Sequence, residues 1–471
     1  MNHHPLRALS SSVSAQPQAQ WLVPRVTSPL LPQLAFSPKP FYISKFPTSL
    51  TLFSRFPTSS LTFTSISASA SSVSASSMAS DAKKVLVPIA NRTEPLEAVV
   101  TVDVLRRAGA EVTVASVEKE LQVDAGHGVK IVADASINDC SQTVFDLISL
   151  SGGMPGATTL KDSAPLRSMV EKQAADGRLH AAICASPAVT LGSWGLLKGL
   201  KATCHPSLME QLSSSAIAVE SRVQQDGKVV TSRGPGTTLE YSVALVEQLY
   251  GKQKADEVAG PLLMRPNHGE EYLFRELNST QWTFNDCPQI LVPVADGSEE
   301  MEAVIIIDVL RRAKAKVVVA SVGEKLEILA SRKVKLVADT HLDEAAKLSY
   351  DLIVLPGGLG GAQAFAASVK LVEILKKQRE ANKPYGAICA SPALVLEPHG
   401  LLKDKKATAF PALCNKLSDP NEIENRVVVD GCLITSRGPG TSMEFALTIV
   451  EKFFGRQKAI ELAKAMLFMH P

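Results

Sequence analysis

The chain has 471 residues, of which 45% are hydrophobic, 20% charged and 5% aromatic. This length corresponds to two to four domains of about 100–200 residues each. Lys and Arg number 49 against 47 Asp and Glu, a net charge of +2, which argues against a basic surface for nucleic acid or for an anionic membrane. No apolar run approaches the roughly 18 residues of a membrane-spanning helix. The seven cysteines form no CxxC pair, so we expect a soluble, reduced protein without a disulfide scaffold or a zinc site.

Residues 1–80 differ in composition from the rest of the chain. They contain no Asp or Glu, five basic residues and twenty serines. An acid-free, Ser-rich, mildly basic leader is typical of an organelle transit peptide. We expect the chloroplast as destination because Ser and Thr greatly outnumber Arg, with the mitochondrion or the cytoplasm as alternatives. A disordered Ser/Pro tail without a targeting role is the other interpretation.

The rest of the chain repeats itself at an offset of 205 residues. Val102–Ala108 returns as Ile307–Ala313, Ala182–Ala188 as Ala387–Ala393 and, at an offset of 204, Ser232–Thr237 as Ser436–Thr441. This period exceeds the roughly 20–50 residues of solenoid repeats, so it predicts a tandem duplication of a whole domain. We expect copy one over residues 83–264 and copy two over residues 288–471. The polar, aperiodic stretch 265–287 between them is predicted to be a linker.

Within copy one, short apolar runs alternate with helical patterns. In chain order we expect a strand at Val85–Ile89, a helix over Glu97–Ala108, strands at Val112–Ala115 and Phe145–Leu150, a further helix, a strand at Ala181–Ile183 and a helix-like stretch at Ser186–Trp194. Continuous apolar strands separated by helices predict an α/β fold, with a mostly parallel sheet covered by helices on both faces. Ligands bind at the carboxyl ends of such strands. Glu97, Gly152-Gly153 and Cys184 are predicted to meet at that edge.

Cys184 and Cys389 each follow a small-residue strand and precede a helical stretch. A thiol placed there faces the positive end of the helix dipole, which favours the thiolate. The arrangement resembles a nucleophile on a strand-to-helix turn, with Cys in place of Ser. A small buried hydrophobic residue is the alternative interpretation, and the retention of Cys at the same turn in both copies favours the nucleophile.

Glu97 and Glu302 stand at helix starts, each 87 residues before its Cys. A carboxyl group beside a thiolate would hold a proton and act as general acid and base; a glutamate that only stabilises the helix N-terminus fits the spacing equally well. Two glycine pairs that end strands could donate backbone N–H groups to an oxyanion or could simply form tight turns: Gly152, Gly153, Gly357 and Gly358. Arg233 and Arg437 could anchor a carboxylate, although an ion pair within the loop explains them better.

His205 follows Cys184 by 21 residues and is a candidate general base; a structural histidine is the alternative. Copy two has Phe410 at the matching position, and phenylalanine cannot transfer protons. We therefore expect the two sites to differ chemically. Sequence alone does not decide whether Cys204 is a second reactive thiol.

Four motifs in copy two resemble the DJ-1/PfpI superfamily, and within it the DJ-1 type. They are Gly297–Glu302, Leu355–Gly358, Ala387–Ala390, and Glu424–Arg426 with Ser436–Thr441. The resemblance covers both copies and implies two tandem flavodoxin-like domains. Duplicated domains behind a leader resemble the plant chloroplast homologues of the family.

The resemblance implies that Cys184 and Cys389 are oxidation-prone nucleophiles, that Glu97 and Glu302 are carboxylic acids hydrogen-bonded to sulfur, and that His205 is the histidine near the thiol. Copy one departs from the family pattern at Thr93–Glu97, at Ser151 and at His127, where copy two has Arg332. Copy two departs at Phe410. Neither copy therefore matches the family in every motif.

Two functions follow from the resemblance. The first is a glutathione-independent glyoxalase, or a related deglycase, which acts on small reactive carbonyls and needs no metal or other cofactor. The second is a non-enzymatic redox sensor or stress chaperone whose cysteine is oxidised by peroxide to the sulfinate. The single-domain relatives form homodimers, so we expect either a pseudo-dimer of the two copies within one chain or a homodimer, without nucleic-acid or membrane partners.

Overall fold

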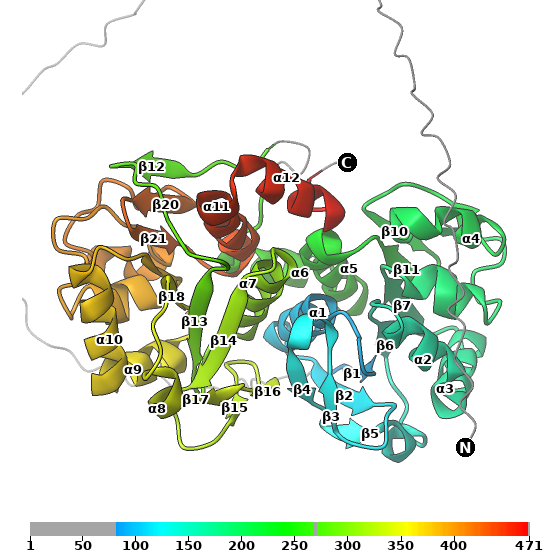
Figure 1. Cartoon of the computed structure of the whole chain (residues 1–471). Helices are drawn as coiled ribbons and strands as arrows, with labels where there is room; N and C mark the ends of the chain where they lie inside the picture. The colour runs from blue at the N-terminus through cyan, green and yellow to red at the C-terminus, as the bar shows by residue number, and fades with distance from the viewer. Residues whose placement is uncertain (1–81, 267–270, 470–471) are drawn as a thin grey trace, which may run out of the picture. The chain divides into compact units, whose positions relative to one another are not determined.

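The computed structural model of the chain describes residues 82–266 and 271–469. The leader predicted over residues 1–80 lies outside these residues. In the described part, the two copies share most of their elements in the same order, and each builds one large sheet (Figure 1). No helix in this part of the chain has the length and hydropathy needed to cross a membrane.

Copy one forms a seven-stranded sheet in the order β10-β11-β7-β6-β1-β2-β5. Neighbouring strands run parallel except for the edge hairpin β10–β11. The strands are β1 (Lys84–Ile89), β2 (Glu111–Ser116), β5 (Ala135–Ser136), β6 (Leu147–Leu150), β7 (Leu179–Ile183), β10 (Val223–Asp226) and β11 (Val229–Ser232), with a separate small pair β8 (Lys201–Ala202) and β9 (Ile217–Ala218). The helices are α1 (Pro95–Arg107), α2 (Gly156–Asp162), α3 (Ala164–Ala175), α4 (Met209–Ser213), α5 (Thr238–Tyr250) and α6 (Lys252–Leu262).

Copy two forms an eight-stranded sheet in the order β12-β20-β21-β19-β18-β13-β14-β17. Its strands are β12 (Arg275–Leu277), β13 (Gln289–Val294), β14 (Lys316–Ser321), β17 (Thr340–His341), β18 (Leu352–Leu355), β19 (Tyr385–Ile388), β20 (Val427–Asp430) and β21 (Leu433–Ser436). Its helices are α7 (Glu300–Arg312), α8 (Leu342–Ala345), α9 (Leu359–Ala367), α10 (Val369–Glu380), α11 (Ser442–Phe454) and α12 (Arg456–Ala465). The predicted α/β class and the mostly parallel sheets are confirmed.

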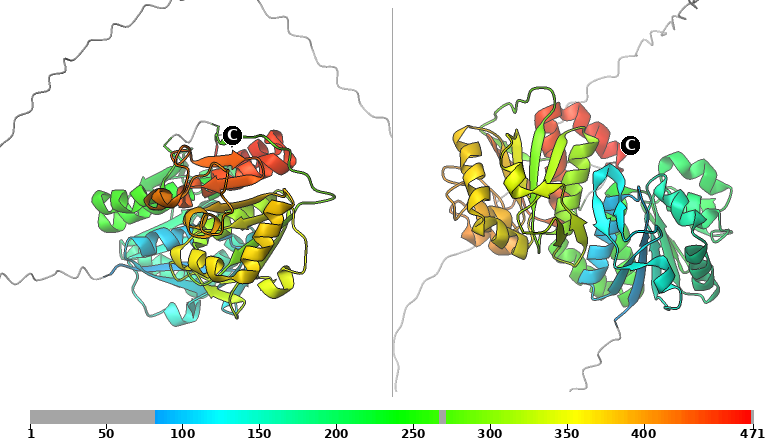
Figure 2. Two further views of the ribbon diagram at one scale, coloured as in Figure 1. Left: turned by 90° about the vertical axis from the view of Figure 1, so that its left-hand side faces the viewer. Right: turned by 60° about the horizontal axis from the view of Figure 1, so that its bottom comes forward.

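Both faces of each large sheet are buried, which explains why the strands read as unbroken apolar runs. In β1, Val85 and Val87 belong to one hydrophobic cluster while Leu86 belongs to another, because successive side chains point to opposite faces. Helices α2 and α3 cover the outer face of copy one. In copy two the yellow helices α9 and α10 and the red helix α11 lie on opposite sides of the sheet (Figure 2).

The inner faces of the two sheets share one hydrophobic core. Helix α1 contacts both α5 and α7, and α7 contacts α11; Val99 of α1 and Ile305 of α7 belong to the same buried cluster. A four-stranded sheet, β15 (Glu327–Leu329), β16 (Lys335–Val337), β4 (Lys130–Val132) and β3 (Gln122–Asp124), joins the copies through antiparallel pairing of β16 with β4. Side chains of one copy therefore lie within reach of the other.

The stretch predicted to be a linker contributes a strand to copy two. Strand β12 pairs in parallel with β20 at the sheet edge. Tyr272 and Trp282 are buried, the indole N–H of Trp282 donates to the Gly431 carbonyl at 3.0 Å, and its ring lies edge-on to Phe453. A strand of three residues is too short to show a periodicity in the sequence. Its pairing partner, β20, lies about 150 residues further along the chain.

Candidate functional site

Each candidate cysteine lies on a sharp turn at the carboxyl end of a central strand. Cys184 follows β7 and Cys389 follows β19, and both residues are partly exposed. Their φ angles are +65° and +63°, a left-handed conformation that is uncommon for residues with a Cβ atom and tends to occur at functional sites. A short π-helical turn follows each of them, Pro187–Gly192 and Pro392–Leu396, where the sequence predicted a longer helical stretch.

Glu97 and Glu302 lie beside these cysteines, as predicted. Each is fully buried in the first turn of its helix, α1 or α7. One carboxylate oxygen, Oε2, accepts a 2.7 Å hydrogen bond from the backbone N–H of Gly152 in copy one and of Gly357 in copy two. The carboxyl group also makes a side-chain hydrogen bond with the thiol. The other oxygen, Oε1, has no hydrogen-bond partner among the described residues.

Burial decides the protonation state of these glutamates. It raises the pKa of Glu97 to about 8, with the charge of Glu94 contributing in the same direction, and it raises the pKa of Glu302 to about 8 together with the charge of Glu299. At neutral pH each glutamate therefore carries a proton. Because Oε2 accepts from a glycine N–H, the proton belongs on Oε1.

The expectation that the helix start would favour the thiolate is wrong for the resting protein. Burial raises the pKa of both thiols well above the ordinary value, and a negative charge on Glu97 or Glu302 raises it further. Hydrogen bonds from the N–H groups of Gly153 and Gly358 act in the opposite direction. A helix dipole stabilises an anion by only about 0.3–1 kcal/mol, less than the cost of removing a thiolate from water.

The glycine pairs have divided roles, which corrects their assignment as oxyanion donors. The N–H groups of Gly152 and Gly357 already bind the glutamates, whereas those of Gly153 and Gly358 face the sulfur. Close approach explains why glycine is needed here: a Cβ on Gly152 would lie 2.5 Å from the Cys184 Cβ and 2.9 Å from its sulfur. The turn therefore positions the acid and the thiol together.

The departures of copy one from the family pattern leave this geometry unchanged. The Thr93 hydroxyl accepts a hydrogen bond from the Ala90 N–H at 2.9 Å, and Ser298 accepts the corresponding bond from Ala295 at 3.0 Å. The glutamate-to-glycine distance is the same in both copies. Thr93 thus replaces Ser298 without displacing the acid.

His205 lies next to the Cys184 turn. Its backbone N–H donates to the Cys184 carbonyl at 2.8 Å, and its ring Nδ1 lies 2.8 Å from the Ser207 hydroxyl. Burial and the charge of Arg233 lower the pKa of the imidazole, so the ring is neutral and can accept a proton. Phe410 makes the same backbone bond to Cys389 in copy two, and its ring takes the place of the imidazole.

The two arginines hold loops. The Arg233 guanidinium donates weakly, at 3.4 Å, to the backbone carbonyls of Cys204 and Glu220, and Arg437 donates to the Glu424 carbonyl at 3.3 Å and pairs with its carboxylate at 3.4 Å. Arg233 thereby braces the segment that carries His205. The neighbouring Cys204 is fully buried, and burial raises the pKa of its thiol to about 12, which makes it a poor second nucleophile.

Sequence reasoning did not identify two further features of the site. Ser186 and Ser391 each donate a 2.6 Å hydrogen bond to a carbonyl, that of Ser151 or of Pro356, and so tie the cysteine turn to the glycine pair. The Cys-Ala-Ser-Pro run in both copies was the available signal. The second feature is a set of buried ion pairs between the copies, such as Arg107 with Glu299 at 2.8 Å and Arg312 with Glu94 at 2.6 Å.

Comparisons with known proteins show the family to which the chain belongs. The model of the DJ-1/PfpI family matches residues 83–248 and 288–452. Protein DJ-1 homolog B of Arabidopsis thaliana is 69% identical over 390 residues, covering 83% of this chain and 89% of the relative. Glutathione-independent glyoxalase DJR-1.2 of Caenorhabditis elegans is 33% identical over 180 residues, 38% of this chain and 94% of the relative. A solved structure of oxidized Toxoplasma gondii DJ-1 is 46% identical with a TM-score of 0.38, and covers 39% of this chain and 98% of that chain. The chain belongs to the DJ-1/PfpI family and contains its domain twice.

Proposed function

We propose that this chain is a glutathione-independent glyoxalase that converts methylglyoxal to lactate at Cys184 and Cys389. The observation that carries the proposal is the buried glutamic acid that touches a partly exposed cysteine on a strained turn, repeated in both copies. The Caenorhabditis elegans relative named as a glutathione-independent glyoxalase supports the same chemistry. A deglycase, which removes methylglyoxal adducts from proteins or nucleotides, would use the same residues.

The first step is addition of the thiol to the aldehyde. The active form of the pair has lost one of its two protons, and the remaining proton exchanges between the sulfur and the Glu97 carboxyl group. Sulfur attacks as thiolate in the form in which Glu97 holds that proton on Oε1. A sulfur–carbon bond forms, the aldehyde oxygen takes the proton from Glu97, and the product is a hemithioacetal. Glu97 is left as a carboxylate beside the carbon that still bears hydrogen.

The carboxylate then moves that hydrogen. Glu97 removes the proton from the hemithioacetal carbon to give an enediolate. The hydroxyl proton passes from the oxygen of this carbon to the oxygen of the neighbouring carbon, and Glu97 returns its proton to that neighbouring carbon, which produces a lactoyl thioester. Water hydrolyses the thioester, lactate leaves, and the cysteine is regenerated. Methylglyoxal and water thus become lactate without any external oxidant or reductant.

The two copies are proposed to differ in the hydrolysis step. In copy one the neutral imidazole of His205, next to the Cys184 turn, can activate the water. Copy two has Phe410 at the position that corresponds to His205, and phenylalanine cannot activate water. We therefore expect copy one to turn over faster, and His205→Phe to lower its rate to that of copy two, as measured in chains in which only one cysteine is intact.

A sensor role is the second candidate, and copy two favours it. There the thiol has the acid Glu302 and the N–H of Gly358 but lacks a histidine. Those groups can hold a cysteine sulfinate, which accepts hydrogen bonds through its oxygens. Titration with peroxide followed by mass spectrometry tests this role: it predicts a gain of two oxygen atoms at Cys389, and oxidation no faster than at Cys432 would contradict it.

We infer that the functional unit is the intramolecular pair of copies, because they share a core and a sheet. We also propose that residues 1–80 direct import into chloroplasts, on the strength of their composition. A fluorescent fusion of these residues tests the destination, and uniform cytoplasmic fluorescence would contradict it.

The enzyme proposal is tested by lactate formation from methylglyoxal in the full-length chain without glutathione. Glu97→Gln with Glu302→Gln keeps the shape of the side chain but cannot transfer the proton, so the rate is expected to fall by at least about 100-fold. Glu111→Gln, at an exposed position of β2, is the matched control. An unchanged rate in the double variant would refute the assigned role of the glutamates.

A further inference from the structure

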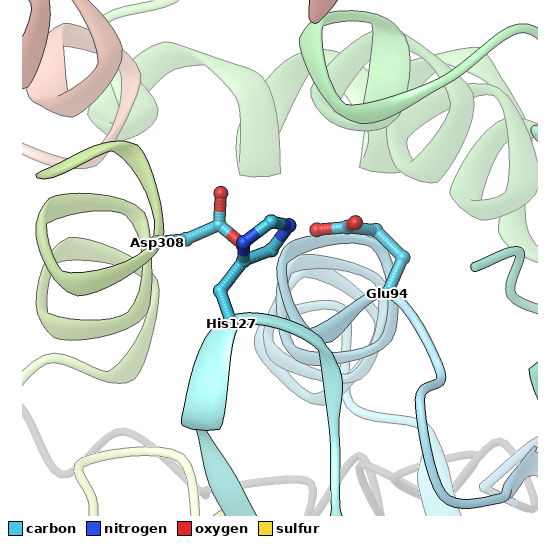
Figure 3. Close-up of side chains that lie close together, drawn as sticks. All are labelled: Glu94, His127 and Asp308. Carbon is cyan, nitrogen blue, oxygen red and sulfur yellow. The ribbon is translucent and has the colours of Figure 1, made fainter. Parts of the chain in front are cut away.

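A buried cluster of polar side chains spans the junction between the copies, outside the cysteine sites. Glu94 and His127 come from copy one and Asp308 comes from α7 of copy two (Figure 3). One donor atom from each residue lies within 4.8 Å of the other two. Imidazole nitrogen and carboxylate oxygen are common ligands of zinc and of related divalent metals.

The cluster contains an oxygen without a donor. Glu94 is 7% exposed, and its Oε1 has no hydrogen-bond partner among the described residues. In Figure 3 the carboxyl groups of Glu94 and Asp308 both lie close to the His127 ring. Two acidic groups that face each other in a buried place need a proton or a cation between them.

Arg312 neutralises only part of this charge. Its guanidinium binds Oε2 of Glu94 at 2.6 Å and Oδ1 of Asp308, while Oδ2 of Asp308 has only a long 3.5 Å contact with it. Asp308 also makes a side-chain hydrogen bond with Glu94, so the two carboxyl groups share a proton, which a metal ion bound to Oε1 of Glu94 and Oδ2 of Asp308 would displace. With both carboxylates ionised and the imidazole neutral, the cluster and Arg312 together have a net charge of −1, which a divalent cation would offset.

The imidazole is available as a ligand. Its backbone carbonyl accepts from Arg311, but among the described residues the ring makes no hydrogen bond. A neutral imidazole ring without a hydrogen bond can offer its lone pair to a metal ion. His127 is half-buried, which leaves a path for an ion from solvent.

The equivalent place in copy two provides an internal comparison. Glu299 and Asp103 correspond to Glu94 and Asp308, but Arg332 stands where copy one has His127. The additional acid there, Glu300, accepts hydrogen bonds from the Ser331 hydroxyl and from the backbone N–H of Arg332 at 2.9 Å. That cluster lacks an imidazole, and its third acid, Glu300, already accepts hydrogen bonds from neighbouring residues. The two junction clusters are therefore not equivalent.

We propose that Glu94, His127 and Asp308 form a binding site for a divalent transition metal, best fitted by zinc, which links copy one to copy two. Zinc bonds of about 2.0–2.2 Å place neighbouring donors in a tetrahedron roughly 3.4 Å apart, so the three donors need to approach one another by no more than about 1.4 Å. Water completes the coordination. The evidence for this site does not depend on the proposed glyoxalase reaction.

The test is a titration of the untagged full-length chain, stripped with a chelator, with Zn²⁺ by calorimetry and with Co²⁺ by visible absorption. His127→Asn removes the imidazole, and Asn tolerates the positive φ of +54° at this position. The wild type is expected to bind one more equivalent of metal ion than His127→Asn does. If the variant still binds this additional ion, the wild type is expected to bind it at least about 10-fold more tightly. Asp308→Asn, on the other copy, is expected to lose the same equivalent.

His341→Asn, at a half-buried position of β17, controls for loss of a histidine elsewhere. His127→Arg installs the residue that copy two carries and serves as the second variant should His127→Asn fail to fold. Zinc is also expected to raise the melting temperature of the wild type and of His341→Asn but not that of the His127 variants. Equal metal stoichiometry and affinity in the wild type and the His127 variants would overturn the proposal. In that case a proton, and not a metal ion, lies between Glu94 and Asp308.

Discussion

Replacement of Glu97 by Gln tests the statement that burial keeps this side chain protonated. The amide is isosteric with the acid: its oxygen can accept from the Gly152 N–H, as Glu97 Oε2 does at 2.7 Å, and its NH₂ group can face the sulfur. Unlike the acid, it has no proton to lose. The variant therefore removes the pH dependence that the carboxyl group adds to folding while keeping the contacts.

The magnitude follows from linkage. The pKa of Glu97 rises from 4.5 to about 8 on folding, so between these pH values the native state holds a proton that the unfolded state has lost. The contribution to stability is complete below pH 4.5 and is lost as the pH rises through about 8. At about 1.4 kcal/mol per pKa unit, the loss amounts to roughly 5 kcal/mol.

Urea unfolding of the wild type and of Glu97→Gln at several pH values between 4.5 and 9 measures this quantity. The variant is expected to gain stability relative to the wild type by roughly 5 kcal/mol from pH 4.5 to pH 8, and the difference is expected to stay constant above that. Glu111→Gln, at an exposed site, controls for the loss of a glutamate. A difference that does not change with pH would show that the Glu97 carboxyl group titrates normally and would refute the reasoning.

The remaining predictions concern the same site and the junction. Because the active pair must lose one proton, kcat/KM for methylglyoxal is expected to rise about tenfold per pH unit up to about pH 8 and then level off; a profile that is flat from pH 6 to 9 would contradict this. Gly152→Ala places a Cβ 2.5 Å from the Cys184 Cβ and is expected to cost about 1–3 kcal/mol in unfolding free energy, whereas Gly260→Ala, with open space around it, is expected to cost nothing. Arg312→Ala leaves Glu94 and Asp308 without their cation and is expected to destabilise the chain by about 3–5 kcal/mol in urea unfolding; a loss no larger than that of the exposed Arg167→Ala would contradict the ion-pair account.

The fold was predictable because its signals are local or repeated. Unbroken apolar runs mark strands buried on both faces, and the offset of 205 residues places the central strands and the long helices of copy one a second time in copy two. The position of Cys184 at a strand end and of Glu97 in a first helical turn followed from the same patterns. Their contact needed the topology, since β1 and β7 are separated by β6 in the sheet.

Other features depend on contacts that no spacing in the sequence encodes. The Gly152 N–H binds Glu97 instead of remaining free for an oxyanion, because the α1 start and the β6 end approach across the sheet edge. Strand β12 forms only because β20 offers it a partner. The Glu94, His127 and Asp308 cluster combines residues from both copies, so the search for metal-ligand spacing within the sequence could not find it.

The central claim is that the cysteine pair performs glyoxalase chemistry, and the most direct measurement is lactate formation from methylglyoxal by the full-length chain without glutathione. The wild type is compared with Cys184→Ala, Cys389→Ala and the double variant, while Cys432→Ala controls for loss of a cysteine outside the sites. The account predicts that the double variant produces no lactate above the uncatalysed rate and that Cys184→Ala loses the larger share of the wild-type activity. Equal lactate formation by the wild type and the double variant would contradict it.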